Sequence, residues 1–220
     1  MSNPYPAYPA PPLQRMTWMV RTEQLTAIIA MLLPTKRCGD MIKRFYSSQA
    51  EFDNIHLKQT PCPHCKRVGP LIRYGFLRGY DENHQHHRTV RARRVFCNNR
   101  KRARGCGRTF SVWAADKIRR LSLTATTLWA FLKRAIGSGN KLDALRSLAC
   151  GLSDSAPYRI WRRFDQAQSS IRTAIARRCQ PPSVPGLDPA RQTVAHLQVA
   201  FPNDPCPIAA FQQNLQTFFL

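Results

Sequence analysis

The sequence predicts an α+β protein built from several small modules. Apolar residues recur at helical spacing before residue 61 and again after residue 113. Between these stretches the helical spacing stops, and short strand-like segments stand beside two pairs of cysteines. A length of 220 residues leaves room for two or three such modules, since a domain typically takes about 100–200 residues.

The charge of the chain is strongly one-sided. There are 34 Lys and Arg against 12 Asp and Glu, so the net charge is +22. This balance indicates a polyanionic partner, either nucleic acid or an anionic membrane surface. The longest apolar run, Ala27–Leu33, is far shorter than the roughly 20 residues of a spanning helix. We therefore expect no membrane segment and a cytoplasmic, nucleoid-associated protein, in which paired cysteines bind metal rather than form disulfides.

Two segments precede the cysteines. Residues 1–14 are rich in proline and tyrosine, which predicts a disordered arm. Residues 15–60 are expected to be helical, as a packing helix pair or as a surface for dimerisation or another protein. The first helix follows from Leu25, Ile28, Ile29, Leu32 and Leu33, and a second short one from Met41, Ile42, Phe45 and Tyr46.

Residues 61–113 are expected to form a zinc ribbon. Leu71–Phe76 and Thr89–Phe96 are typical of strands. Cys62 and Cys65 form a two-residue knuckle, and Cys97 and Cys106 are a wider pair separated by eight residues. Four thiolates complete a closed tetrahedral site, so the pattern predicts one structural Zn²⁺, whose binding stabilises two small strand pairs that bury too little surface alone.

One alternative ligand set stays open. It has three of these cysteines and one histidine, drawn from His64, His84, His86 and His87. The remaining cysteines have no partner at ligand spacing, and we expect them to be small buried or incidental residues. They are Cys38, Cys150, Cys179 and Cys206.

The same segment is basic and aromatic. The loop between the second pair of cysteines, with the residue after Gly107, is expected to lie along phosphates. Its cations are Arg100, Lys101, Arg102, Arg104 and Arg108. Aromatic side chains alternate with the basic residues, and we expect them to pack in the ribbon core, with stacking on single-stranded bases as the alternative. They are Tyr74, Phe76, Tyr80, Phe96 and Phe110.

Residues 114–178 are expected to form a trihelical helix–turn–helix domain. A helix that ends near Gly139 is followed by a short helix at Lys141–Ala149, a turn at Cys150–Ser153, and a long helix from Ala156. Pro157 fits the first turn of that helix, and Ser153 or Ser155 is expected to cap it. The polar side of the long helix is the candidate DNA-reading surface, because Arg and Gln bond base edges. Its residues are Ser155, Tyr158, Arg159, Arg162, Arg163 and Gln166.

Residues 179–220 carry seven prolines and little charge. No regular structure is predicted for them. An irregular tail is expected, either disordered or packed on the body or on a partner.

The order of these motifs resembles a known family. CPHC, then VFC, then GCGRTFSVW, followed by a helix–turn–helix with YRIWRRF, resembles the zinc-ribbon and helix–turn–helix region of insertion-sequence transposases and their short DNA-binding companion proteins. The resemblance spans about residues 61–166. It implies that the four paired cysteines bind zinc and that the Ala156–Gln166 helix reads terminal repeats or an operator.

The catalytic chemistry of that family is not expected on this chain, and we expect it not to be an enzyme. Such recombinases hold metal ions with three carboxylates, and after Asp165 only Asp188 and Asp204 follow. The sequence therefore predicts a double-stranded DNA-binding protein, either the recognition component or a remnant of a transposase. A homodimer or a catalytic transposase is a candidate partner. A transcriptional regulator, an RNA- or single-strand-binding zinc module and an assembly subunit are the alternatives.

Overall fold

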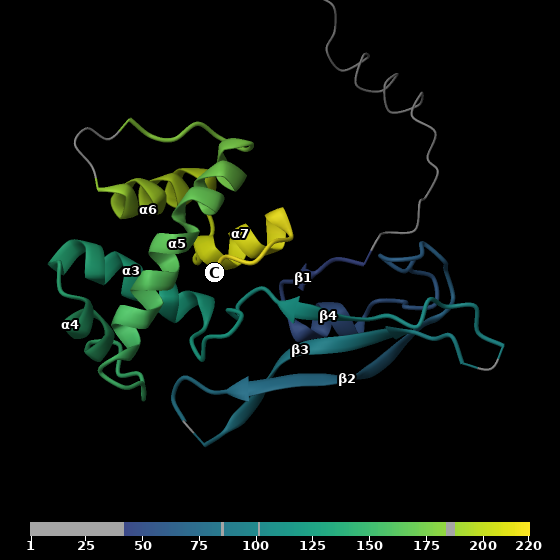
Figure 1. Ribbon diagram of the computed structural model, residues 1–220. Helices are drawn as coiled ribbons and strands as arrows, with labels where there is room; N and C mark the ends of the chain where they lie inside the picture. The colour runs from purple at the N-terminus through teal and green to yellow at the C-terminus, as the bar shows by residue number, and fades with distance from the viewer. Residues whose placement is uncertain (1–41, 85, 101, 184–187) are drawn as a thin grey trace, which may run out of the picture. The chain divides into compact units, whose positions relative to one another are not determined.

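The computed structural model describes residues 42–84, 86–100, 102–183 and 188–220. Over these ranges the chain is α+β, with a four-stranded mixed sheet and six helices, as predicted for the fold class (Figure 1). The predicted arm at 1–14 and the predicted helix around Leu25–Leu33 lie outside the described residues. None of the described helices is both long and apolar enough to cross a membrane.

The sheet has the strand order β1-β4-β3-β2. Strand β3 (Arg88–Cys97) pairs antiparallel with both β2 (Leu71–Tyr80) and β4 (Thr109–Ala114), and β1 (Phe45–Tyr46) pairs parallel with β4. The two predicted strands are confirmed, and both extend further than predicted. Strand β2 lies at the edge of the sheet and carries two irregularities in its register with β3.

The second predicted N-terminal helix is wrong. Phe45 and Tyr46 form β1, which is held to β4 by hydrogen bonds from Trp113 N to Arg44 O at 2.8 Å and from Ala115 N to Tyr46 O at 2.7 Å. Periodicity cannot separate a strand from a helix over so short an apolar run, and pairing with a distant strand decides it here. The sheet therefore begins before the predicted boundary at residue 61.

A short helix follows β1. Helix α2 (Gln49–Asp53) is capped by Ser48, whose hydroxyl accepts a hydrogen bond from Glu51 N at 3.1 Å, while the Glu51 carboxylate accepts from Ser47 N at 2.7 Å. These reciprocal bonds satisfy backbone donors at the start of the helix. Phe52 is buried against one side of the sheet, in a small core that includes Leu71, Val95 and Val112.

Three helices follow the sheet in the predicted order. Helix α3 (Ala125–Ser138) ends at Gly139, which has a φ of 70° that suits glycine. Helix α4 (Lys141–Arg146) is capped by Asn140, and helix α5 (Ala156–Ala176) has Pro157 in its first turn. Ser155 makes no capping hydrogen bond. Its hydroxyl lies 3.1 Å from that of Ser153 instead, so the predicted cap is wrong.

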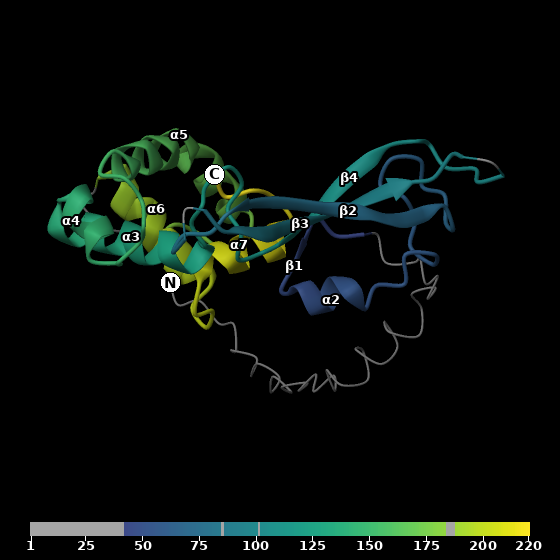
Figure 2. The same ribbon diagram turned by 90° about the horizontal axis from the view of Figure 1, so that it is seen from below.

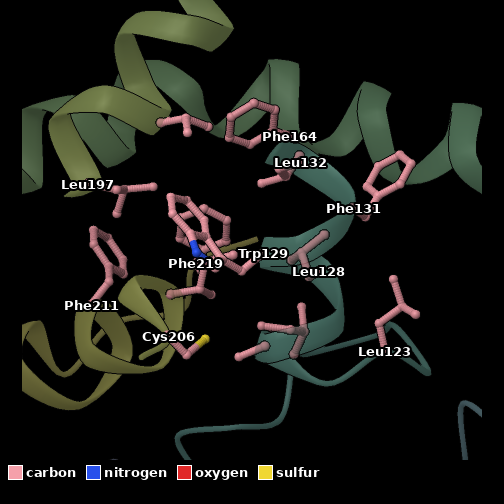
Figure 3. Close-up of a cluster of buried hydrophobic side chains, with 14 of the residues drawn as sticks. Leu123, Leu128, Trp129, Phe131, Leu132, Phe164, Leu197, Cys206, Phe211 and Phe219 are labelled. Carbon is pink, nitrogen blue, oxygen red and sulfur yellow. The ribbon is translucent and has the colours of Figure 1, made fainter. Parts of the chain in front are cut away.

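The C-terminal segment is not irregular. It forms α6 (Pro189–Ala200) and α7 (Pro207–Leu215), whose prolines lie in the first turn, where the missing N–H costs no intrahelical bond. Phe211 and Phe219 are buried with Phe164 of α5, and Figure 3 shows them gathered around Trp129 of α3. The proline content suggested a break in structure, whereas two of these prolines begin helices that complete the helical core.

Hydrogen bonds connect the sheet to the helices. The Gln212 side chain of α7 donates to Ala115 O at 2.8 Å, and the Gln216 amide oxygen accepts from Phe45 N at 3.0 Å. The Arg91 guanidinium of β3 donates to Ile118 O at 3.0 Å. The connection after β4 is therefore bonded both by a side chain of α7 and by a side chain of β3. The apolar cores of the sheet and of the helices are nevertheless separate.

The buried C-terminus gives a stability prediction. We expect Phe219→Ala to lower the free energy of unfolding by about 3–5 kcal/mol, because this ring is 1% exposed and its removal leaves a cavity. Val199→Ala on α6, at a side chain that is 50% exposed, should change it by less than about 0.5 kcal/mol. Urea unfolding followed by circular dichroism measures both. Equal and small effects would contradict a C-terminal segment that belongs to the core.

Candidate metal centre and nucleic-acid interface

The first pair of cysteines lies on a tight turn. Cys62 N donates to Arg67 O at 2.9 Å, and Lys66 N donates to Cys62 O at 2.9 Å, so the turn closes on itself. Lys66 has a φ of 62°, a left-handed conformation that the turn requires. His64 N donates a hydrogen bond to the Cys62 sulfur at 3.4 Å.

The second pair closes in a similar way despite its wide spacing. Gly105 N donates to Asn98 O at 2.8 Å, which closes the base of the loop. The described residues of the loop, 99, 100 and 102–104, project beyond the ends of the strands (Figure 2). A Cβ on Gly105 would lie 2.1 Å from that same oxygen, so only glycine fits there. With the projecting residues set aside, Cys97, Asn98, Gly105 and Cys106 stand in the spacing of a two-residue knuckle.

The four sulfur atoms meet. The Sγ atoms of Cys62, Cys65, Cys97 and Cys106 all lie within 4.8 Å of one another. Cys62 Sγ and Cys106 Sγ are 3.9 Å apart, and Cys65 Sγ and Cys97 Sγ are 3.7 Å apart. A disulfide has its sulfurs about 2.05 Å apart. A regular tetrahedron with metal–sulfur bonds of about 2.3 Å has edges of about 3.8 Å, so the cluster has the dimensions of a site for one metal ion.

No histidine joins this group. The ring of His64 contacts Phe110 edge-on, with centroids 5.9 Å apart, and the other three candidates lie in the exposed connection between β2 and β3. Within the part of the chain that the structure describes, the four cysteines are the one group of three or more potential ligands at such distances. Cys150, Cys179 and Cys206 lie apart from it, and Cys38 is outside the described residues.

The thiols differ in their electrostatics. A hydrogen bond from the Arg67 backbone N–H lowers the pKa of Cys65 to about 7, whereas burial raises the pKa of Cys97 to about 12. Cys106 N also donates to Cys97 Sγ at 3.2 Å, which favours the thiolate. Four thiolates this close repel one another, and a divalent cation between them removes that cost. Because Cys62 and Cys97 have no exposed surface, the centre suits a structural ion.

The basic loop is exposed as predicted. Arg100, Arg102, Arg104 and Arg108 are all exposed, and Lys101 lies outside the described residues. Arg67 contributes to the loop through a hydrogen bond from its guanidinium to the Arg104 carbonyl. The Arg100 guanidinium lies over the Phe96 ring, 5.7 Å from its centroid.

The polar residues predicted to read DNA from helix α5 lie in two different environments. Those on the exposed side are Ser155, Tyr158, Arg159, Arg162 and Gln166. Arg163 does not belong with them, because its guanidinium donates to Arg119 O at 3.2 Å and to Arg120 O at 3.3 Å. Burial lowers the pKa of Arg163, and the nearby charge of Arg120 lowers it further. Arg163 therefore holds the connection before α3, and we correct its predicted placement on the DNA-reading surface.

Sequence reasoning missed two residues that fix this connection. Arg91 is 7% exposed and bonds carbonyl groups of the segment after β4. Glu82, in the β2–β3 turn, accepts hydrogen bonds from Thr124 N at 2.6 Å and from the Thr127 hydroxyl at 3.0 Å. A glycine within a strand is a local sign that another group approaches closely, and Gly79 is such a residue. A Cβ there would lie 2.3 Å from the Arg91 side chain.

The predicted packing of the sheet aromatics is only partly right. Phe96 and Phe110 are at least half-buried, but Tyr74, Phe76 and Tyr80 are 49%, 46% and 50% exposed. All three lie on β2, whose edge position leaves few neighbours to cover them.

Comparisons with known proteins do not place the chain: no protein-family model, curated protein or solved structure matches it.

The metal centre leads to a second prediction. We expect the native protein to carry one metal ion per chain, and Cys97→Ser to release it, because the lost thiolate opens a closed site. Elemental analysis after gel filtration measures the ion. The sheet should then lose structure while α3 to α7 remain folded, since their apolar core is separate, and backbone NMR distinguishes the two regions.

The matched control is Cys150→Ser, which lies outside the cluster and should leave the ion bound. Native protein without metal, or a sheet that keeps its full NMR dispersion in chelator, would contradict the prediction.

Proposed function

We propose that this chain is a zinc-dependent, double-stranded DNA-binding protein, which serves as the non-catalytic recognition component, or a remnant, of a transposase. The observation that carries the proposal is the exposed side of α5, where Tyr158, Arg159, Arg162 and Gln166 face solvent directly after a short helix and a turn. Arg and Gln are side chains that bond base edges from a helix in the major groove.

The turn between α4 and α5 is held in a way that suits this role. The Arg146 guanidinium pairs with Asp154 at 2.8 Å across the turn, and Arg134 of α3 donates to Ser147 O at 2.8 Å. Gly151 N donates to Glu82 O at 3.2 Å, which ties the same turn to the β2–β3 connection. In the proposed helix–turn–helix, α4 braces the start of α5 so that its exposed residues are held at a fixed angle.

Zinc is the proposed metal because four thiolates at tetrahedral spacing are its usual structural ligands. In that reading the ion shapes the base of the basic loop. The exposed cations Arg102, Arg104 and Arg108 then lie along phosphates and supply affinity without sequence information.

The proposal leaves the strand-transfer chemistry to another subunit. The chain has only 12 acidic residues, and they are scattered, whereas recombinase chemistry needs carboxylates clustered around metal ions. A homodimer on an inverted repeat, or a complex with a catalytic transposase, follows as the working assembly.

Selection of bound sequences from a random duplex pool tests the proposal directly. We expect a defined consensus, and an inverted repeat within it would indicate a dimer. Binding that never enriches a sequence would leave only charge-driven affinity and would contradict sequence recognition.

Substitution of three arginines separates affinity from specificity. Arg102→Ala removes a phosphate contact, so it should flatten the slope of log affinity against log salt by about one, equally on selected and random duplexes. Arg162→Ala removes a base contact and should cost about 1–3 kcal/mol on the selected duplex alone. Fluorescence anisotropy at a fixed, stated salt concentration measures both.

Arg163→Ala is the matched control, because its guanidinium is already bonded to backbone carbonyls. It should lower thermal stability and leave base preference unchanged. Parallel losses on both duplexes for Arg162→Ala would refute the role of α5 in base reading.

The absence of catalysis is a separate prediction. The isolated chain should neither nick nor join supercoiled DNA with Mg²⁺ or Mn²⁺, because no cluster of carboxylates is expected to hold the ions. Agarose gels of plasmid topology check this. Cleavage that disappears when one or two acidic residues are replaced by amides would show an active site on this chain.

A further inference from the structure

Strand β2 exposes aromatic side chains to an unusual degree. Six large apolar side chains are exposed among the described residues, and three of them, Tyr74, Phe76 and Tyr80, lie on this one edge strand. Such a concentration of exposed rings indicates a binding surface rather than incidental exposure.

The sheet register places Tyr74 on a particular side of the sheet. Leu71, Val95 and Cys97 belong to the small core beside α2, so the alternating residue Phe96 lies on the opposite side. The Tyr74 ring contacts the Phe96 ring with centroids 5.4 Å apart, which puts Tyr74 on that side too. Arg73 pairs with Val95 on the core side, so the alternation of the strand turns Tyr74 to the opposite face. The register shift between Arg73 and Gly75 then returns Phe76 to the core side, opposite Arg93.

Two guanidinium groups border these rings. Arg94 lies over the Tyr74 ring at 5.5 Å from its centroid, and Arg100 over the Phe96 ring at 5.7 Å. Neither arginine forms an ion pair within the described part of the chain. We call Tyr74, Phe96, Arg94 and Arg100 the Tyr74 surface.

On the other side of the same strand, the arginine beside Phe76 is paired with a carboxylate. Phe76 pairs in register with Arg93, whose guanidinium lies 4.3 Å from the Phe76 centroid. Arg93 is neutralised by Asp53 of α2 at 3.0 Å. Arg93 beside Phe76 is therefore less available to a phosphate than Arg94 and Arg100 on the Tyr74 surface.

We propose that the Tyr74 surface binds single-stranded nucleic acid, with an unpaired base stacked on the exposed Tyr74 ring and with Arg94 and Arg100 on the flanking phosphates. Phe96 is 9% exposed and packs against the Tyr74 ring. An aromatic face flanked by free guanidinium groups matches a base joined to phosphates, and the net charge of +22 favours such a polyanion over an apolar protein partner. Paired bases are unsuitable, because their flat faces are covered by neighbouring base pairs.

This activity goes beyond duplex recognition by α5, and its test is independent. The probes are a short single-stranded DNA of mixed sequence, RNA of the same sequence, and the fully paired DNA duplex. Tyr74→Ala should weaken binding of at least one single strand by roughly 5- to 150-fold, the effect of losing one stacked base, and leave duplex binding unchanged. The DNA and RNA arms show which strand is bound.

Two variants make the test specific. Tyr74→Phe keeps the ring and should retain full affinity, whereas Tyr74→Leu keeps an apolar cover on Phe96 but offers no aromatic face, so it should behave as Tyr74→Ala. Phe76→Ala is the matched control, since it removes an equally exposed ring from the same strand, beside the neutralised Arg93. It should change affinity less than about twofold.

A photochemical measurement checks contact directly. A strand containing 5-iodouracil should crosslink to Tyr74 on irradiation, and mass spectrometry of the digested wild-type protein locates the site. The proposal is overturned if Tyr74→Ala and Tyr74→Leu keep full affinity for both single strands, if they weaken the duplex equally, or if crosslinks form only elsewhere. If no duplex consensus is found but single-strand binding depends on Tyr74 as expected, only the proposed role of α5 is contradicted, and the Tyr74 surface stands.

Discussion

The four-thiol cluster is the constraint on which the sheet depends. The core between the sheet and α2 contains nine buried residues, and two of them are Cys62 and Cys97 themselves. So small a core stabilises little by apolar burial, and sheets of this size usually need a covalent or metal crosslink. The cluster joins the turn before β2 to the ends of β3 and β4, and thereby fixes both ends of the basic loop.

The second constraint is the connection between the sheet and the helices. Arg91 carries a buried charge, and burial lowers its pKa, while nearby Asp116 and Glu82 oppose that change. Its bonds go to carbonyl groups, which satisfy the guanidinium without a close ion pair. Together with Glu82 at the start of α3, it fixes the path of the chain from β4 into the helical core.

The sequence predicted what depends on local pattern and ligand chemistry. The α+β class, the two long strands and the three middle helices follow from spacing within short windows, and the meeting of the four cysteines follows from the ligand number of a metal site. Three errors share another cause. The β1 strand, the burial of Phe219 and the occupied guanidinium of Arg163 each depend on a partner that is distant in sequence, and no local pattern specifies that partner.

The prolines of the C-terminal segment led to a wrong prediction because the effect of a proline depends on its position in a helix, which was unknown. Proline breaks a helix in the interior but suits its first turn. Pro189 and Pro207 lie in first turns. Only the packing of Phe211 and Phe219 against α3 and α5 shows which case applies. The number of prolines in this segment was therefore a poorer guide to its secondary structure than the spacing of the apolar residues that follow Pro189 and Pro207.

The arginines explain why charge alone does not define a binding surface. A net charge of +22 attracts polyanions at low salt, so the proposed sequence preference would have to come from side chains with a fixed geometry. Arg162 and Arg163 are neighbours, yet one faces solvent and the other is bonded to two carbonyls. On the sheet, Arg94 and Arg100 are already placed over aromatic rings. A guanidinium held in this way would lose less rotamer entropy on binding a phosphate, so in the proposed complexes these residues should contribute more to affinity than unrestrained arginines.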